Sequence, residues 1–361
     1  MAEAHPMQRI LVTGGAGFIG STLLRQLLER QCASVLCYDA LTYAGLPESI
    51  SELQGREGYQ FVHGDVTDRA CLDRAIESFE PDTLINLAAE SHVDRSIATP
   101  DLFVQTNVAG TACVLGAWLE YRDRLDRRGD GSAERLRLLH VSTDEVFGPI
   151  PEGQAVKEND SYRPSSPYSA SKAAADHLVR AYERTYGLNA MIAYPTNNYG
   201  PRQFPEKLIP LAIQRAVAGQ KIPIFGDGLQ SRDWLHVNDC CRGLIAIAER
   251  GANGEAYCLG ASDHASAEQW SNLKIVQFIS GVLDELVHTH REIVHLGVER
   301  IELIEKTNDR PGHDRRYAVD SRKARTELSW APETTIEQGL RATVGWYLEN
   351  VHWCEVTQRK R

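Results

Sequence analysis

The chain has 361 residues, a length that corresponds to about two domains, or to one large α/β unit with an elaboration, and that can bury a full core. Apolar residues make up 42% and charged residues 24% of the sequence, which excludes disordered, collagen-like and coiled-coil chains. The formal net charge of -10 lacks the basic footprint of a nucleic-acid binder, so no nucleic-acid partner is expected.

The sequence contains no pattern typical of a membrane span, an export signal or a metal site. We find no apolar run near the ~18 residues that a membrane span needs, and the polar start from Met1 to Gln8 leaves no room for a signal peptide. Eight cysteines form no C-x-x-C pair and are interpreted as reduced thiols. His288, His290 and His295 are interpreted as surface residues. The sequence therefore predicts a cytoplasmic protein with no membrane partner and no metal.

Short β-branched runs alternate with helical patterns through the first half of the chain. Strands are expected at 10–13, 34–38, 59–62, 83–87 and 136–142, and helices near 18–30, 68–80, 100–123 and 167–186. Strands separated by such helices predict an α/β fold with a doubly wound parallel (Rossmann) sheet.

The pattern loosens beyond Tyr194, where Pro and Gly become denser. We therefore expect a first domain over residues 1–196 and a smaller C-terminal lobe over 197–361. The segment 233–250 ends in a helical apolar pattern and is expected to return to the first domain.

A glycine-rich stretch follows the first strand. Gly15, Gly17 and Gly20 have G-x-G-x-x-G spacing between a strand and a helix, which permits a tight turn and close approach to a pyrophosphate. The helix N-terminus then supplies N–H groups to the phosphates. Asp39 ends the second strand, which suits a ribose diol, and no Lys or Arg occurs from Ala40 to Ser51. The motif predicts NAD, favoured over NADP.

Two adjacent carboxylates follow the strand expected at 136–142. Asp144 and Glu145 come directly after Thr143, at the carboxyl end of a strand, where doubly wound folds bind their ligands. The segment by itself is equally consistent with a helix cap or a solvated loop.

Tyr168 and Lys172 lie four residues apart on a helix that Pro167 can begin. A lysine ammonium beside a phenol favours the phenolate, so Tyr168 could act as a base toward a hydroxyl. An ordinary pair on a helix surface is the alternative.

Taken together, these residues resemble the extended short-chain dehydrogenase/reductase family and, within it, the nucleotide-sugar 4,6-dehydratases, with those that act on dTDP-glucose the most similar. The resemblance runs from about residue 8 to about residue 350 and includes 13–20, 39–45, 87–96, 142–146, 168–172, 197–210, 232–234 and 309–314. The Thr143-Asp144-Glu145 triplet and the Asp309–His313 stretch are the specific parts, because other family members share the glycines and Tyr-x-x-x-Lys but lack the Asp-Glu pair.

The resemblance implies a reaction in three steps. Thr143 and Tyr168 would hold the sugar O4 while Tyr168 removes its proton and a hydride passes to NAD. The C4 ketone acidifies the C5 hydrogen, so Glu145 can act as base while a protonated Asp144 donates to the departing C6 hydroxyl. The hydride then returns to C6.

The resemblance also implies which residues bind each ligand. For NAD these are Gly14, Gly17, Phe18, Ile19, Gly20, Asp39, Thr42, Asp65, Val66, Ala88, Ala89, Ser91, Thr106, Tyr168, Lys172 and Asn198. For the nucleotide-diphosphate sugar they are His92, Thr143, Asn197, Lys207, Leu208, Pro223, Phe225, Arg232, Asn272, Arg310 and His313. Arg232 and Arg310 are the expected phosphate binders. The domain over 1–196 would bind NAD and the lobe over 197–361 the nucleotide sugar.

Other functions are consistent with the same fold, and two helices predict an oligomeric state. A UDP- or CDP-glucose 4,6-dehydratase, a nucleotide-sugar 4-epimerase or decarboxylase, and a non-catalytic NAD-binding protein share this fold. The helices that follow Asp101 and Tyr168 carry apolar residues on more than one side, which is more than packing on a single sheet face requires. The resemblance implies that they pair with their copies in a four-helix bundle, which predicts a homodimer.

Overall fold

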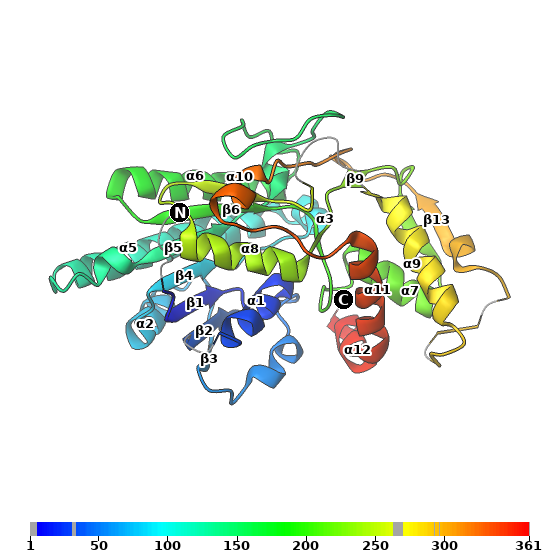
Figure 1. Ribbon diagram of the computed structural model, residues 1–361, viewed down its shortest axis with the longest axis horizontal. Helices are drawn as coiled ribbons and strands as arrows, with labels where there is room; N and C mark the ends of the chain where they lie inside the picture. The colour runs from blue at the N-terminus through cyan, green and yellow to red at the C-terminus, as the bar shows by residue number, and fades with distance from the viewer. Residues whose placement is uncertain (1–5, 31–33, 263–269, 292, 296, 361) are drawn as a thin grey trace.

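The computed structural model describes residues 6–30, 34–262, 270–291, 293–295 and 297–360, and within them a seven-stranded parallel sheet forms the centre of the larger lobe (Figure 1). Its order is β11-β6-β5-β4-β1-β2-β3. The strands are β1 (Arg9–Thr13), β2 (Ser34–Asp39), β3 (Tyr59–His63), β4 (Thr83–Asn86), β5 (Arg137–Val141), β6 (Ala190–Pro195) and β11 (Ala256–Leu259). The predicted fold class is confirmed.

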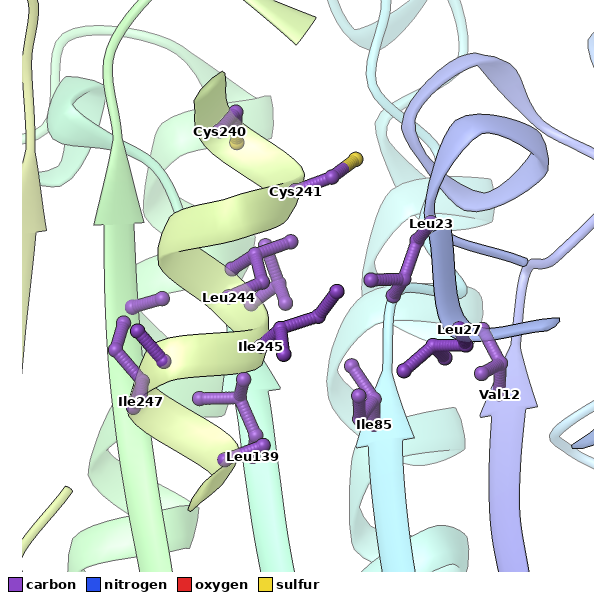
Figure 2. Close-up of a cluster of buried hydrophobic side chains, with 14 of the residues drawn as sticks. Val12, Leu23, Leu27, Ile85, Leu139, Cys240, Cys241, Leu244, Ile245 and Ile247 are labelled. Carbon is purple, nitrogen blue, oxygen red and sulfur yellow. The ribbon is translucent and has the colours of Figure 1, made fainter. Parts of the chain in front are cut away.

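Helices cover both faces of this sheet because strand side chains alternate between the faces. Val12, Ile85 and Leu139 point toward α1 (Phe18–Leu28) and α8 (Val237–Arg250), as Figure 2 shows. Leu11 and Leu138 pack on the other face, which is covered by α2 (Arg69–Phe79), α5 (Gly110–Asp126) and α6 (Pro167–Tyr186). Between α4 (Pro100–Phe103) and α5 runs a π-helical turn, Val104–Ala109.

Elements from beyond residue 196 also belong to this lobe. Helix α8 packs on α1, β5 and β6, as expected for the returning segment. The seventh strand, β11, lies outside the expected 233–250 segment and pairs in parallel with β6. Its four residues are all buried, so they carry no alternation by which the sequence could have identified a strand.

The smaller lobe has its own core, at the right of Figure 1. It contains α7 (Leu208–Val217), β8 (Ile222–Phe225), α9 (Asn272–Leu286), β13 (Ile304–Thr307), α11 (Ile336–Glu349) and α12 (Val351–Lys360). Two-residue strands β7 (Asn198–Tyr199), β9 (Ser231–Arg232), β10 (Leu235–His236) and β12 (Trp270–Ser271) form short pairs. The remaining elements are α3 (Val93–Ala98), α10 (Arg322–Glu327) and the 3₁₀ turns 47–49, 51–53, 133–135, 144–147 and 300–303.

One helical segment is long and apolar enough to cross a membrane by length and composition. It runs over Pro100–Asp126 and has a window of mean hydropathy 1.4, of which 44% is buried. The sequence analysis missed it because Gln105, Thr106 and Asn107 interrupt the apolar run. Val114 and Trp118 of this segment are buried in the core on the sheet, which is the packing of a core helix.

Candidate active site

The loop between β1 and α1 requires glycine for steric reasons. Gly14 has a left-handed φ of +69°, and a Cβ there would lie 2.7 Å from the backbone nitrogen of Ala88. A Cβ at Gly20 would overlap the carbonyl oxygen of Gly14. Gly17 caps α1 in an extended conformation without a side-chain hydrogen bond. The backbone can therefore approach a ligand closely at the N-terminus of α1.

Asp39 at the end of β2 both braces this loop and lines the cleft beside it. Its Oδ2 accepts a hydrogen bond of 2.8 Å from the Ala16 N–H, and its Oδ1 accepts one of 2.7 Å from the Leu41 N–H. Burial raises the pKa of this carboxyl, and the two backbone donors oppose that effect. The side chain is thereby held at the rim where a ribose would lie.

A single cleft collects the residues that the resemblance assigns to NAD. Its lining contains Gly14, Gly17, Phe18, Ile19, Gly20, Asp39, Thr42, Asp65, Val66, Ala88, Ala89, Ser91, Thr106, Tyr168 and Lys172. Asn198 is not among the lining residues. It lies in β7, where its Nδ2 donates to the Thr196 carbonyl at 2.9 Å and its Oδ1 is buried without a protein partner. The sequence analysis missed Glu90, Gln203, Phe204 and Glu206 of this lining.

The Thr-Asp-Glu triplet follows β5 directly, as the sequence predicted. Thr143, and neither carboxylate, caps the 3₁₀ turn 144–147, because the Glu145 N–H donates to its Oγ1 at 3.3 Å. Thr143 Oγ1 donates to Asp144 Oδ1 at 3.3 Å, while Asp144 Oδ2 is buried without a hydrogen-bond partner. Capping therefore does not account for the two carboxylates.

The environments of the two carboxylates differ. Burial raises the pKa of Asp144 well above its usual value, and the neighbouring Glu145 raises it further. Burial also raises the pKa of Glu145, but Lys207, Arg232 and Arg310 oppose that effect. Asp144 is thus the better proton donor of the two, and Glu145, whose ionised form the cations favour, is the better base.

Tyr168 and Lys172 lie on one side of α6, whose start is set by Pro167 and by a capping box between Ser166 and Ser169. That Lys172 favours the Tyr168 phenolate stays a prediction. Burial and the charge of Glu145 raise the pKa of Tyr168, which a hydrogen bond with Thr143 opposes. The Lys172 ammonium instead donates to the Val141 carbonyl at 2.8 Å.

Basic side chains from three distant segments meet around Glu145. Lys207, before α7, donates to the Ser91 carbonyl at 2.8 Å. Arg232 is 5% exposed, stacks on the Tyr317 ring at 4.6 Å and donates to the Asp314 carbonyl at 3.0 Å. Arg310 lies 3.4 Å from Asp94. These cations make a site for an anionic ligand beside the carboxylates.

The other predicted substrate residues surround this cluster. His92 Nε2 lies 3.9 Å from Glu206, and His313 Nδ1 lies 2.6 Å from Asp309. Pro223 and Phe225 lie on β8, and the Phe225 ring is 6.2 Å from that of His313. The side-chain Oδ1 of Asn197 is buried without a hydrogen-bond partner, and Leu208 begins α7.

Asn272 begins α9, and its N–H donates to the Gln230 carbonyl at 3.0 Å. Gln230 Nε2 in turn lies 3.4 Å from Asp309. Gln230 therefore connects Asn272 to the 309–314 stretch. Residues 263–269, shortly before Asn272, lie outside the described residues.

Tyr317 and Glu206 were not singled out by sequence reasoning. The Tyr317 hydroxyl donates to Asp314 at 2.6 Å, and Glu145 lies close enough to raise its pKa. Glu206 accepts from the Tyr43 hydroxyl at 3.0 Å. Glu206 precedes Lys207 in the matched 197–210 stretch and could have been found there, whereas no local pattern marks Tyr317.

No group of three or more His, Cys, Asp or Glu suited to a metal ion occurs in the part of the chain that the structure describes. His288 and His295 are exposed and their rings lie 5.5 Å apart.

The chain was compared with known proteins. A family model described as GDP-mannose 4,6 dehydratase matches residues 11–343. A dTDP-glucose 4,6-dehydratase from Xanthomonas campestris is 46% identical over 345 residues, which cover 96% of this chain and 94% of that protein. The structure of a dTDP-glucose 4,6-dehydratase from Streptomyces venezuelae with NAD and dTDP bound is similar at TM-score 0.85 and 39% identity, covering 97% of this chain and 99% of that one. A UDP-glucose 4-epimerase from Thermus thermophilus in complex with NAD is similar at TM-score 0.79 and 26% identity, covering 95% and 99%.

Proposed function

This chain belongs to the GDP-mannose 4,6-dehydratase family, and we propose that it is a dTDP-glucose 4,6-dehydratase, an NAD-dependent hydro-lyase that forms dTDP-4-keto-6-deoxyglucose. The observation that carries this function is the Asp144-Glu145 pair beside Tyr168, in which burial raises the pKa of Asp144 well above its usual value while three cations oppose the same effect at Glu145. Elimination of water needs one acid and one base at neighbouring carbons, and this pair supplies both.

The cofactor is NAD, which accepts the hydride from C4 and returns it to C6. The glycine loop fits its pyrophosphate because side chains are sterically excluded at Gly14 and Gly20. Asp39 at the rim of the cleft fits the ribose diol. We propose that the lining residues given above hold NAD, that residues 1–196 with the returning 233–250 form the NAD-binding domain, and that 197–361 bind the nucleotide sugar.

In the first step Tyr168 and Thr143 act on the sugar O4. The two side chains share a hydrogen bond, so an O4 hydroxyl beside them can give its proton to Tyr168 while the C4 hydride leaves. Lys172, buried behind Tyr168, supplies the positive charge that makes a deprotonated Tyr168 accessible once the ligands have displaced water.

In the second step Glu145 removes the C5 proton and Asp144 protonates the departing C6 hydroxyl. Glu145 returns its proton to C5 when the hydride reaches C6. The proton taken from O4 must then restore Asp144, since overall the O4 proton leaves in the water molecule. Thr143, which is bonded to both Tyr168 and Asp144, connects the two groups. The net reaction consumes no reduced nicotinamide.

The substrate test uses a panel of dTDP-, UDP- and CDP-glucose, with alkaline detection of the 4-keto sugar. We expect the 4-keto product from dTDP-glucose at the highest kcat/KM. A preference for UDP-glucose or CDP-glucose would mean that the enzyme recognises uracil or cytosine instead of thymine. Formation of a galactose epimer without any 4-keto product would make the chain an epimerase, for which the Asp144-Glu145 pair has no use.

Asp39→Ala is expected to weaken NAD binding roughly 10- to 100-fold, because hydrogen bonds to a charged acceptor contribute about 1.5–3 kcal/mol. NADP should bind relatively better, since the substitution removes a negative charge from the place of a 2′-phosphate. Calorimetric titration with both cofactors measures the two affinities. Glu52→Ala, which removes an exposed carboxylate outside the cleft, serves as the control. An unchanged NAD affinity would contradict the assignment of Asp39.

We propose a homodimer in which α5 and α6 pair with their copies. In the single chain Val114, Trp118 and Val179 are already buried, so these residues do not support the interface. Support comes instead from Val104, 55% exposed in the π-helical turn that leads into α5, and from the small residues Ala109 of the same turn and Ala181 of α6, which are also exposed.

Sedimentation at micromolar concentration is expected to give twice the 40.2 kDa chain mass. Ala181→Glu should dissociate the dimer, because it places a charge in a packed helix interface, whereas a matched change at Thr326, exposed on α10, should not. A wild-type monomer would contradict this proposal.

We also propose that the protein acts in the cytoplasm. The described cysteines Cys37, Cys71, Cys113, Cys240, Cys241, Cys258 and Cys354 are free thiols, which supports a reducing compartment; Cys32 lies outside the described residues.

A further inference from the structure

A row of buried polar side chains crosses the sheet behind the catalytic residues. It begins at Thr13 on β1, passes Asn86 on β4 and His140 on β5, and ends at Asp176 on α6, and these four side chains are between 0% and 2% exposed. The reaction steps derived above use none of them. Buried polar groups of this kind require hydrogen-bond partners. One member of the row, His140, lies next to Lys172.

The hydrogen bonds along the row set the protonation of His140. The Ala88 N–H donates to Thr13 Oγ1 at 3.3 Å, so Thr13 can donate to Asn86 Oδ1 at 2.6 Å. This orients the Asn86 Nδ2 to donate to His140 Nδ1 at 3.1 Å. Nδ1 is then an acceptor, and the ring hydrogen is on Nε2. Burial, followed by the charge of Lys172, lowers the pKa of His140, so the ring is neutral.

The Nε2 atom of His140 lies between two charged groups. It is 3.5 Å from Lys172 Nζ and 3.5 Å from Asp176 Oδ1. Because Nε2 carries hydrogen, it can donate to Asp176 but cannot accept from Lys172, whose ammonium donates to the Val141 carbonyl at 2.8 Å. The imidazole therefore keeps the carboxylate near the ammonium without a direct bond between them.

Further donors hold Asp176 in place. Its Oδ2 accepts from Ser142 Oγ at 2.7 Å and from the Tyr162 hydroxyl at 3.1 Å. Tyr162 is bonded to Tyr194, to which Arg180 of α6 donates at 3.1 Å. These hydrogen bonds fix the position of the Asp176 carboxylate.

Of the other ionisable groups, His140 on β5 lies 3.5 Å from Lys172, and Tyr168 precedes Lys172 on α6. The charges of Asp144 and Glu145 act on Tyr168. Burial lowers the pKa of Lys172 to about 8, and the charge of Asp176 opposes that effect.

We propose that Asp176 is the counter-ion of Lys172 and that His140 is the neutral spacer between them, which makes both of them positioning residues for the Tyr168-Lys172 pair. The role in turnover rests on the proposed function. A directly paired carboxylate would neutralise the field of the ammonium at Tyr168, and a missing one would leave a buried lysine that loses its proton. With His140 between them, Asp176 is close enough to keep Lys172 protonated but does not pair directly with its ammonium.

The test follows the titration of Lys172 in the NAD-loaded protein by NMR of ¹³C-labelled lysine side chains. The chain has eight lysines, and Lys172→Arg identifies the signal. In Asp176→Asn the Lys172 midpoint should move down from about 8 by roughly 1 to 3 pH units. Tyr162→Phe, which removes a donor to Asp176 but no charge, should leave it in place. An unmoved midpoint in Asp176→Asn would overturn the proposal.

Turnover gives a second readout. In Asp176→Asn, kcat at pH 8 should fall about fivefold or more and recover toward the wild-type value at pH 6, with KM unchanged because neither Asp176 nor His140 lines the cleft. If wild-type protein shows no turnover of dTDP-glucose while the NMR midpoint still moves, the proposed function fails and the counter-ion role stands. A pH-independent loss of kcat, with an unmoved midpoint, would leave Asp176 a purely structural residue.

His140 is tested by a pair of variants. His140→Gln can accept from Asn86 and donate to Asp176, so it should keep the Lys172 midpoint and kcat close to wild type. His140→Leu leaves Asn86 Nδ2 without an acceptor and Asp176 Oδ1 without a donor, and it should lower kcat. If the Leu variant does not fold, His140→Gln decides the question: a displaced midpoint in this folded variant would refute the spacer role.

Discussion

Tyr168→Phe should block the first step of the reaction, so that no reduced nicotinamide appears when dTDP-glucose is mixed with the NAD-loaded enzyme. The hydroxyl bonded to Thr143 is the group that receives the O4 proton, and the ring without it has no base. Asp144→Asn and Glu145→Gln act afterwards. They should leave oxidation partly intact while elimination slows, each by roughly 10²- to 10⁴-fold.

Stopped-flow absorbance of NADH separates these variants, because NADH should accumulate transiently in the two carboxamide variants and remain absent in Tyr168→Phe. Solvent deuterium should enter C5 in the wild type, since Glu145 exchanges its proton with water before returning it. Tyr186→Phe, at an exposed phenol outside the cleft lining, is the control. Wild-type dehydration rates in both carboxamide variants would contradict the acid and base roles and favour an epimerase.

Leu244→Ala should lower the free energy of unfolding by about 2–5 kcal/mol, the usual cost of removing a fully buried leucine side chain. Leu244 is 0% exposed on the face of α8 that packs on the sheet and on α1 (Figure 2). Helix α8 comes from the second half of the chain and packs on the sheet and on α1, which come mainly from the first half. Loss of this packing would expose the sheet to solvent next to the glycine loop.

Urea unfolding followed by circular dichroism measures the change. Leu229→Ala is the matched control, because Leu229 is 50% exposed, and it should shift the midpoint little. Equal effects of the two substitutions would mean that α8 does not stabilise the fold as its packing indicates.

The sequence by itself determined the features that depend on neighbouring residues. The runs at Ile10–Thr13 and Ser34–Tyr38 became strands β1 and β2, and Pro167 after Ser166 set the start of α6. The glycine loop and Asp39 were also identified, because backbone sterics and a helix N-terminus are local properties. These features were enough to predict the doubly wound sheet and the cofactor.

Only the tertiary structure decided the ionisation of the site. In the fold the Lys172 ammonium donates to the Val141 carbonyl of β5, while burial and the charge of Glu145 raise the pKa of Tyr168. The spacing of Tyr168 and Lys172 in the sequence indicates neither effect. The different environments of Asp144 and Glu145 arise from Lys207, Arg232 and Arg310, which are separated by tens of residues in the chain. Charge and burial at a point in space depend on segments whose meeting no local pattern encodes, and the place of His140 between Lys172 and Asp176 is set in the same way.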